Sequence, residues 1–259
     1  MRVRKRVLVA TFHSVIAAAY LIMWLAKWSA VDPAAHRRYV HRGWYSPAAD
    51  IVDDIRVLSY QDQECYISIY DGIFHRVCND SNTDWRLMSA IAYAESRFKP
   101  HVISHSGAIG LMQIMPRTAS IYGVTREAVA DPEENIRVAT LHYNLIDYML
   151  DLPESTTLHD RMSLNLACYN GGIGRVRDAQ RLATYHGEDP NSWSVVSQQL
   201  INLRDPNYYE LDVVRGGRFG SAKHTVAYVD NVMYRYDLYC VKTEHCSHHL
   251  YPVTGHYQH

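Results

Sequence analysis

Apolar residues recur at intervals of three and four over most of residues 60–241, the pattern of helices that each bury one face. Alternation typical of a strand is scarce, and the main β-prone run is the short one at 55–60. The pattern therefore predicts a mostly α domain. The helices that it predicts cover residues 65–78, 85–98, 116–123, 132–150, 159–169, 176–185, 192–203 and 221–241.

Local signals fix several helix starts. Asp84 is a good N-cap for the helix over 85–98, and Asp131 followed by Pro132, Glu133 and Glu134 opens the helix over 132–150. One face of that second helix is predicted to be buried through Ile136, Ala139, Tyr143, Ile146 and Leu150. Residues 204–220 are predicted to form a loop.

The first 60 residues have a different character. Four basic residues in 1–6 precede an uncharged run of 20 residues, Val7–Ala26, which is long enough to span a bilayer. We expect a signal anchor or transmembrane segment over 1–30, a linker over 31–59, the helical domain over 60–241 and a histidine-rich tail over 242–259. A cleaved signal is the alternative, because Trp28-Ser-Ala30 loosely resembles a cleavage site.

Charge and cysteine content narrow the function. The net charge of the 259 residues is −1, and no basic block follows residue 6, which argues against nucleic acid as a partner. In an exported domain, Cys65, Cys78, Cys240 and Cys246 can form disulfides, although the sequence does not fix their pairing. Cys168 lies in a helical core pattern and is predicted to be a buried free thiol.

Glu95 is the first candidate for chemistry. It shares one predicted helical face with Met88, Ile91 and Phe98, so its carboxyl group is expected to lie on an apolar stripe. Burying an unpaired carboxylate is costly, and such residues therefore often have a function. The structural alternative is a glutamate that turns to solvent or pairs with Arg97 or Lys99.

The loop that follows, Ser104–Gln113, carries neutral polar groups and glycines. Gly107 and Gly110 allow a positive φ or the close approach of another chain. The side chains of Ser104, Ser106 and Gln113 offer donors and acceptors suited to sugar hydroxyl and acetamido groups. A tight turn between two helices would also account for the glycines.

A third cluster ends the helix over 159–169. Tyr169 and Asn170, followed by Gly171 and Gly172, place a phenol and an amide at a helix end, where both can point into a groove. Taken alone, Asn170-Gly171 is as well explained as a helix stop.

Together these motifs resemble the catalytic domain of the soluble lytic transglycosylases, which has the goose-type lysozyme fold. The resemblance rests on Glu95–Pro100, Gly107–Gln113 and Cys168–Gly171, with Ala227-Tyr228-Val229 matching a later motif that contains a tyrosine. It covers about residues 60–240, and Tyr185–Tyr228 is similar to the carboxy-terminal domain of membrane-bound lytic murein transglycosylase F. The family usually has alanine where this chain has Cys168, and that relative carries a solute-binding-like domain for which this chain has no room.

The resemblance implies an enzyme that cleaves the β-1,4 bond between N-acetylmuramic acid and N-acetylglucosamine and leaves 1,6-anhydromuramoyl ends. Glu95 would be the catalytic acid and base, while Ser104, Ser106, Gln113, Tyr169, Asn170 and Tyr228 would position the glycan. The sequence favours this route independently, because 98–126 and 162–177 contain no second carboxylate of the kind that most glycosidases need.

The expected partner is peptidoglycan, and the expected location is the bacterial cell envelope, with the protein anchored in the membrane and its domain on the outer side. A lysozyme-type hydrolase that uses Glu95 with water, and a non-catalytic peptidoglycan-binding module, are the alternatives. No cofactor or metal is expected. A zinc site in the tail is a weaker possibility, because its histidines and cysteine show no fixed ligand spacing. These residues are His245, Cys246, His248, His249, His256 and His259.

Overall fold

The computed structural model describes residues 66–81 and 83–250. Within that part of the chain the structure is helical, and the only β structure is a pair of isolated bridges that join Ile109 to Ile103 and to Ile114. The mostly α prediction is confirmed. The helices are α4 (Asp71–Ser81), α5 (Trp85–Ser96), α6 (Pro116–Ile121), the 3-10 turn η1 (Ala128–Ala130), α7 (Pro132–Leu150), α8 (Leu158–Gly171), α9 (Ile173–Tyr185), α10 (Trp193–Asn202), α11 (Pro206–Tyr209) and α12 (Ala222–Leu250).

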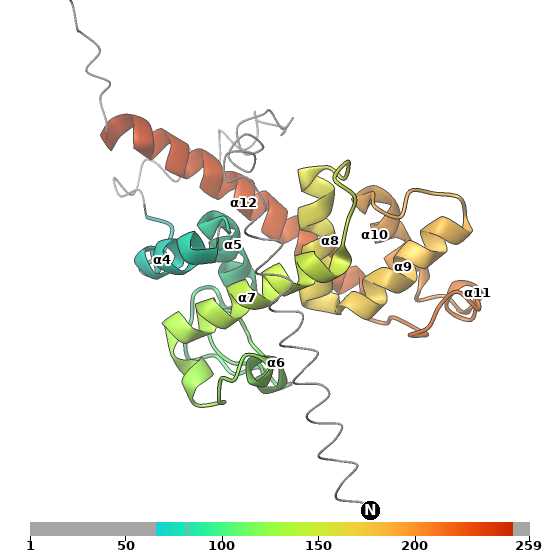
Figure 1. The fold of residues 1–259 in the computed structure, drawn as a ribbon, viewed down its shortest axis with the longest axis horizontal. Helices are drawn as coiled ribbons and strands as arrows, with labels where there is room; N and C mark the ends of the chain where they lie inside the picture. Colours follow the sequence, from blue (N-terminus) through green and yellow to red (C-terminus); the bar gives the residue numbers. More distant parts are fainter. Residues whose placement is uncertain (1–65, 82, 251–259) are drawn as a thin grey trace, which may run out of the picture. The chain divides into compact units, whose positions relative to one another are not determined.

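Helix α12 organises the packing of the other helices. It lies along α5 and α8 and also touches α10, while α4 packs between α5 and α7 (Figure 1). Helices α8, α9 and α10 pack on one another near the beginning of α12 (Figure 1). Apolar side chains from these elements form one continuous core, in which Met88, Ile91, Leu166 and Val229 are completely buried. The segment between α5 and α6 is held against this core by Leu111 and Met112.

The predicted start of α7 is confirmed. The Asp131 side chain accepts hydrogen bonds from the backbone N–H groups of Glu133 and Glu134, at 3.0 and 3.1 Å, and Pro132 occupies the first turn. The predicted stripe faces the core from Ile136 to Ile146, and Leu150 is partly buried against it. Asp84 caps α5 as predicted, by accepting from the N–H of Arg86.

Two helix predictions were wrong at their ends. Helix α5 stops at Ser96, because Arg97 and Phe98 adopt left-handed conformations with φ of 53° and 59°. Phe98 still reaches the core, by packing edge-on against Tyr93. Helix α4 begins only at Asp71, whose carboxylate accepts hydrogen bonds from residues 67 and 68, so that Ile69 precedes the helix and is 91% exposed.

Other boundaries shifted without changing the topology. Helix α12 extends to Leu250, the end of the described chain, and the predicted loop over 204–220 contains the short helix α11. The predicted anchor, the linker, the β-prone run at 55–60 and Cys65 lie outside the described residues. In the described ranges, no helix is both long enough and apolar enough to cross a bilayer.

A buried asparagine in α7 holds the loop after α5 in place. The Asn135 side chain accepts a hydrogen bond from the N–H of Met112 at 2.7 Å and donates to the carbonyls of Ile109 and Val129 at 2.9 and 2.8 Å. Gly110 has a φ of 79°, and a Cβ atom there would lie 2.6 Å from the Asn135 Nδ2 atom. The glycine is therefore required both by its backbone conformation and by the close approach of Asn135.

We predict that Asn135→Ala lowers the free energy of unfolding by about 2–4 kcal/mol, because it removes three hydrogen bonds in the core: those to the Met112 N–H and the Val129 carbonyl, and one of the two that the Ile109 carbonyl accepts. Urea denaturation of the purified domain measures the effect. Asn207→Ala, at an exposed position in α11, is the matched control and should change stability by less than about 0.5 kcal/mol. Equal stability of the two variants would contradict the anchoring role.

Candidate active site

Glu95 lies in the last turn of α5, where the helix ends and the loop begins. Its side chain is partly buried, and the apolar residues Met88 and Ile91 of the same face are fully buried. Burial raises the pKa of the Glu95 carboxyl from 4.5 to about 7, and the nearby Tyr228 hydroxyl opposes this increase only in part. The carboxyl group is therefore protonated in a large fraction of molecules near neutral pH.

No charged group of the described chain accounts for the pKa of Glu95. Among the described residues Glu95 forms no salt bridge, so neither Arg97 nor Lys99 neutralises it as the structural alternative proposed. No carboxylate in the described ranges contributes to the raised pKa either, since desolvation is its cause. The carboxyl is thus isolated from both kinds of charge.

Two tyrosines from other helices lie beside Glu95. Tyr169 comes from α8 and Tyr228 from α12, and burial together with the charge of Glu95 raises the pKa of both phenols well above 10. The Tyr169 hydroxyl donates a hydrogen bond to the Met112 carbonyl at 3.1 Å, which joins α8 to the loop. The Tyr228 hydroxyl is buried and has no partner of ordinary hydrogen-bond geometry among the described residues, although it influences the pKa of Glu95.

The polar residues predicted in the loop have mostly internal partners. The Ser104 Oγ atom accepts a hydrogen bond from the N–H of Ala108 at 2.9 Å. Gln113 has a left-handed backbone, and its Nε2 atom donates to the carbonyls of Val102 and Gly110. Ser106 is exposed. These contacts shape the loop, and none of them joins it directly to Glu95.

Asn170 also has a partner within the fold. Its Oδ1 atom accepts a hydrogen bond from the Thr225 hydroxyl at 2.9 Å, which links the end of α8 to the first turn of α12. Helix α8 continues to Gly171 and ends at Gly172, whose φ is 89°. The helix stop read from the sequence is therefore present, and Asn170 connects the two helices that supply Tyr169 and Tyr228.

Sequence reasoning missed a second aromatic group near the site. The Tyr122 hydroxyl lies 3.2 Å from Nδ1 of His142, and the His142 ring centroid is 6.0 Å from that of Tyr169. Burial lowers the pKa of His142, which favours the neutral imidazole, and the phenol of Tyr122 contributes to the raised pKa of Tyr169. No sequence motif marked these residues, because α6 and α7 bring them together only in the folded chain.

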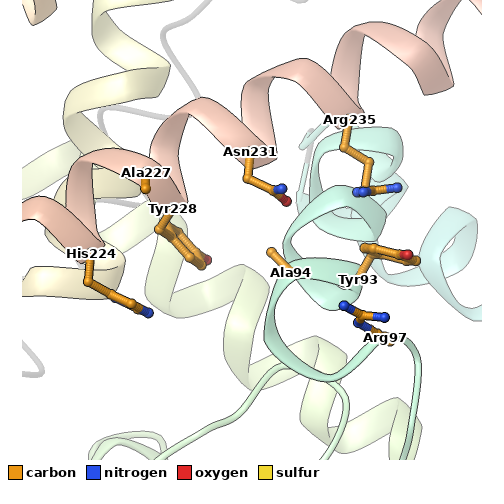
Figure 2. A pocket seen from close by; sticks show the side chains of 8 residues that line it. All are labelled: Tyr93, Ala94, Arg97, His224, Ala227, Tyr228, Asn231 and Arg235. Carbon is orange, nitrogen blue, oxygen red and sulfur yellow. The ribbon is translucent and has the colours of Figure 1, made fainter.

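A pocket of about 330 Å³ lies next to the site, between α5 and α12 (Figure 2). Tyr228 lines one part of it, so the pocket and Glu95 share a neighbour. Sequence reasoning did not single out the pocket, because its residues come from two helices far apart in the chain. Its lining consists of Tyr93, Ala94, Arg97, His224, Ala227, Tyr228, Asn231 and Arg235.

The cysteines and histidines of the described chain form no second candidate site. Cys78, Cys168 and Cys240 are free thiols, and Cys168 is buried as predicted. Cys78 and Cys240 therefore form none of the disulfides that the sequence allowed. Cys65 and the side chain of Cys246 are not described, so only a pairing of these two with each other stays a prediction. Within the described ranges, no group of His, Cys, Asp and Glu side chains could hold a metal ion. The side chains of the histidine-rich tail lie outside those ranges.

Comparison with known proteins defines the class. Residues 73–191 match the model of the transglycosylase SLT domain. The match includes the motifs Glu95–Pro100, Gly107–Gln113 and Cys168–Gly171, on which the predicted resemblance rests. The matched range includes α5, the loop and α8, and it ends before α12, which supplies Tyr228.

Curated relatives extend the similarity beyond that range. The chain is 36% identical over 169 residues to membrane-bound lytic murein transglycosylase F of Stutzerimonas stutzeri, a match that covers 65% of this chain and 33% of the relative. It is 33% identical over 177 residues to the protein of the same name from Marinobacter nauticus, with 68% of this chain and 34% of the relative covered. The chain thus spans about a third of the length of these relatives.

A solved structure supports the fold. The X-ray structure of an inactive mutant of lytic transglycosylase Slt from Pseudomonas aeruginosa superimposes with a TM-score of 0.51 at 21% identity, over 85% of this chain and 32% of that one. At this identity the similarity concerns the fold alone, and it agrees with the expected lysozyme-like architecture.

The raised pKa of Glu95 predicts that the wild type and Glu95→Gln differ in stability by an amount that depends on pH. Between pH 4.5 and 7 the unfolded chain releases the Glu95 proton while the folded chain retains it, so stability falls with rising pH across this range and levels off above it. Glu95→Gln removes this effect. We expect the variant to gain up to about 2–3 kcal/mol over the wild type as pH rises from 4.5 to 8.

Urea denaturation at several pH values measures this difference. Glu127→Gln, at an exposed position before η1, is the control and should differ from the wild type by the same amount at every pH. A pH-independent difference for Glu95→Gln would show that the carboxyl is not desolvated.

Proposed function

We propose that this protein is a lytic transglycosylase of peptidoglycan. It would cleave the β-1,4 bond between N-acetylmuramic acid and N-acetylglucosamine and produce 1,6-anhydromuramoyl ends. The observation that carries the proposal is Glu95, a desolvated carboxyl with a pKa of about 7 and no carboxylate partner among the described residues. The family match and the names of the relatives agree with it.

In the first step, protonated Glu95 acts as the general acid. It gives its proton to the glycosidic oxygen while the bond from that oxygen to the muramoyl anomeric carbon breaks. The N-acetylglucosamine side leaves as an alcohol, and the positive charge at the anomeric carbon is supported by the substrate's own N-acetyl oxygen. A pKa near 7 leaves enough acid form to donate at neutral pH, which an ordinary glutamate would not.

In the second step, the same residue acts as the base. The Glu95 carboxylate takes the proton from the muramoyl 6-hydroxyl, and O6 forms a bond to the anomeric carbon to close the 1,6-anhydro ring. Glu95 is thereby returned to its acid form, and no water is consumed. Because the nucleophile belongs to the same sugar, the step is unimolecular and gains a large entropic advantage.

Two tyrosines are suited to hold the sugar during these steps. The Tyr228 hydroxyl is buried without an ordinary hydrogen-bond partner in the described chain, and it can therefore bind either the Glu95 carboxylate or a substrate oxygen. Tyr169 is fixed by its bond to the Met112 carbonyl and would present its ring to the glycan. Ser104, Gln113 and Asn170 would act through the shape of the loop and helix end, and exposed Ser106 would contact the glycan directly.

Hydrolysis by a water molecule is the rival reaction for the same carboxyl. It usually employs a second carboxylate as base or nucleophile, and no carboxylate perturbs Glu95 within the described part of the chain. A purely binding module is disfavoured for a different reason, since a binding protein gains nothing from keeping an isolated acid partly buried.

We predict that Glu95→Gln reduces the release of muropeptides from purified sacculi by at least about a thousandfold, because glutamine can neither donate nor accept the proton. Mass spectrometry identifies the products of the wild type, which should end in 1,6-anhydromuramoyl groups. The exposed Glu127→Gln variant should match the wild type in rate. Reducing ends in place of anhydro ends would identify a hydrolase, and residual activity of Glu95→Gln within tenfold of wild type would exclude its role.

We further infer that the enzyme acts in the cell envelope and is anchored by its amino-terminal segment. The support is the uncharged run Val7–Ala26 behind a basic flank, together with relatives named as membrane-bound. Such a run favours an orientation with the basic end inside and the SLT domain outside.

Deleting Val7–Ala26 should move the protein from the membrane fraction to the soluble fraction of cells, because the deletion removes the apolar run. Fractionation followed by immunoblotting measures this shift, and the full chain is the control. If the undeleted chain is instead recovered from the soluble fraction with a reduced mass, its amino-terminal segment is a cleaved signal.

A further inference from the structure

The pocket between α5 and α12 carries two arginine side chains and no acidic residue in its lining. Arg97 follows the end of α5, and Arg235 projects from α12; in Figure 2 the two guanidinium groups lie on either side of Tyr93. Within the described chain neither arginine forms a salt bridge. The Asn231 amide adds a neutral donor to the same lining. The pocket is therefore suited to an anion.

Arg235 is held in position by its neighbours. Its guanidinium carbon lies 3.6 Å from the centroid of the Tyr93 ring, a cation–π contact that fixes the plane of the group. It also interacts with the Tyr239 phenol, whose pKa it lowers against the effect of burial. The Arg235 Nε atom is nevertheless buried without a hydrogen-bond partner in the described ranges. A buried guanidinium N–H of this kind is expected to have an acceptor when the site is filled.

Arg97 reaches the pocket because of its backbone. Its φ of 53° ends the helix and turns the side chain away from the course of α5. The left-handed conformation is uncommon for a residue other than glycine and is often found at functional sites. The exposed Arg97 side chain thus faces Arg235 across Tyr93 and is not paired with Glu95, two residues earlier (Figure 2).

The position of the pocket indicates what kind of anion would bind. Tyr228, Asn231 and Arg235 follow one another at intervals of three and four on one face of α12. Seven residues of helix span about 10 Å, which separates Arg235 from the Tyr228 end of the pocket beside Glu95. An extended peptide covers about 10 Å in three residues. A carboxylate two or three residues along a peptide attached to the sugar at Glu95 would thus reach the arginines.

We propose that Arg97 and Arg235 bind a carboxylate of the peptide stem attached to the muramoyl residue, and that they make the enzyme prefer glycan strands that carry stems. The inference rests on the proposed function. Its chemical basis is that the sugars of the strand are uncharged, whereas the stems carry free carboxylates that a guanidinium group binds with two parallel hydrogen bonds. The arginines are specificity residues and take no part in the proton transfers.

The test uses three substrates that share one glycan: strands with free stem carboxylates, strands whose stem carboxylates have been converted to carboxamides, and strands from which an amidase has removed the stems. We expect wild-type kcat/KM to be highest for the first and similar for the other two. Arg97→Gln and Arg235→Gln should each lower the preference for the first substrate by about five- to thirtyfold, the range expected for one charge-assisted interaction.

Matched variants separate this effect from general damage. Arg126→Gln removes an exposed arginine before η1 and should retain the full preference. Arg235→Lys keeps the charge but loses the paired donors, and it should retain part of the preference. Because Arg235 packs on Tyr93, its variants are compared at equal folded fraction by thermal melting, and the exposed Arg97→Gln provides an independent measurement. Equal preferences for wild type and both glutamine variants would overturn the proposal.

A binding experiment distinguishes failure of the pocket proposal from failure of the proposed enzyme function. Dissociation constants of Glu95→Gln for the three strands are measured with and without the added Arg97→Gln substitution. If the wild type cleaves none of the strands, the lyase assignment fails, yet a preference of Glu95→Gln for stem carboxylates that depends on Arg97 would still support the pocket. If Glu95→Gln binds all three strands equally, the pocket proposal fails whatever the catalytic result.

Discussion

The chemistry proposed for this protein depends on keeping one carboxyl group away from water and from other charges. Glu95 meets that condition because three helices supply its surroundings: its own α5, α8 through Tyr169, and α12 through Tyr228. Desolvation alone then raises the pKa of Glu95 to about 7. A single cation beside the carboxyl would cancel the effect, so the arrangement of the nearby arginines matters as much as the apolar packing.

Sequence patterns predicted the helices well where local signals determine them. Capping by Asp84 and Asp131 and the 3.6-residue repeat of α7 depend on neighbours within a few residues, and the structure confirms them. The errors at Ile69 and Phe98 are of the same kind, because both residues are apolar and in phase with a neighbouring helix but lie outside it. Hydrogen bonds to the Asp71 side chain set the start of α4 after Ile69, and a left-handed turn ends α5 before Phe98. The periodicity of apolar residues does not reveal where such contacts begin or end a helix.

The site was only partly predictable. Glu95, Tyr169 and Tyr228 were predicted because their motifs resemble a known family, and the structure places them together. Asn135 lies beside the apolar stripe of α7 and reads as an ordinary surface position, yet it holds the backbone of the loop through contacts more than twenty residues away. Tyr122, His142 and the Arg97–Arg235 pair depend likewise on tertiary contacts that leave no local pattern. Such residues come together only in the folded chain, so one sequence does not predict that they are neighbours.

The left-handed turn after α5 serves the pocket and leaves the acid alone. In a continued helix Arg97 would point away from Glu95, because residues two apart do not share a helical face. The turn at Arg97 directs the guanidinium across Tyr93 toward Arg235 (Figure 2), and it too brings no charge to Glu95. The proposed binding of a stem carboxylate therefore depends on the backbone conformation of Arg97, whereas the proposed proton transfer depends on the desolvation of Glu95. The two sites share Tyr228 as a neighbour but rest on different physical causes.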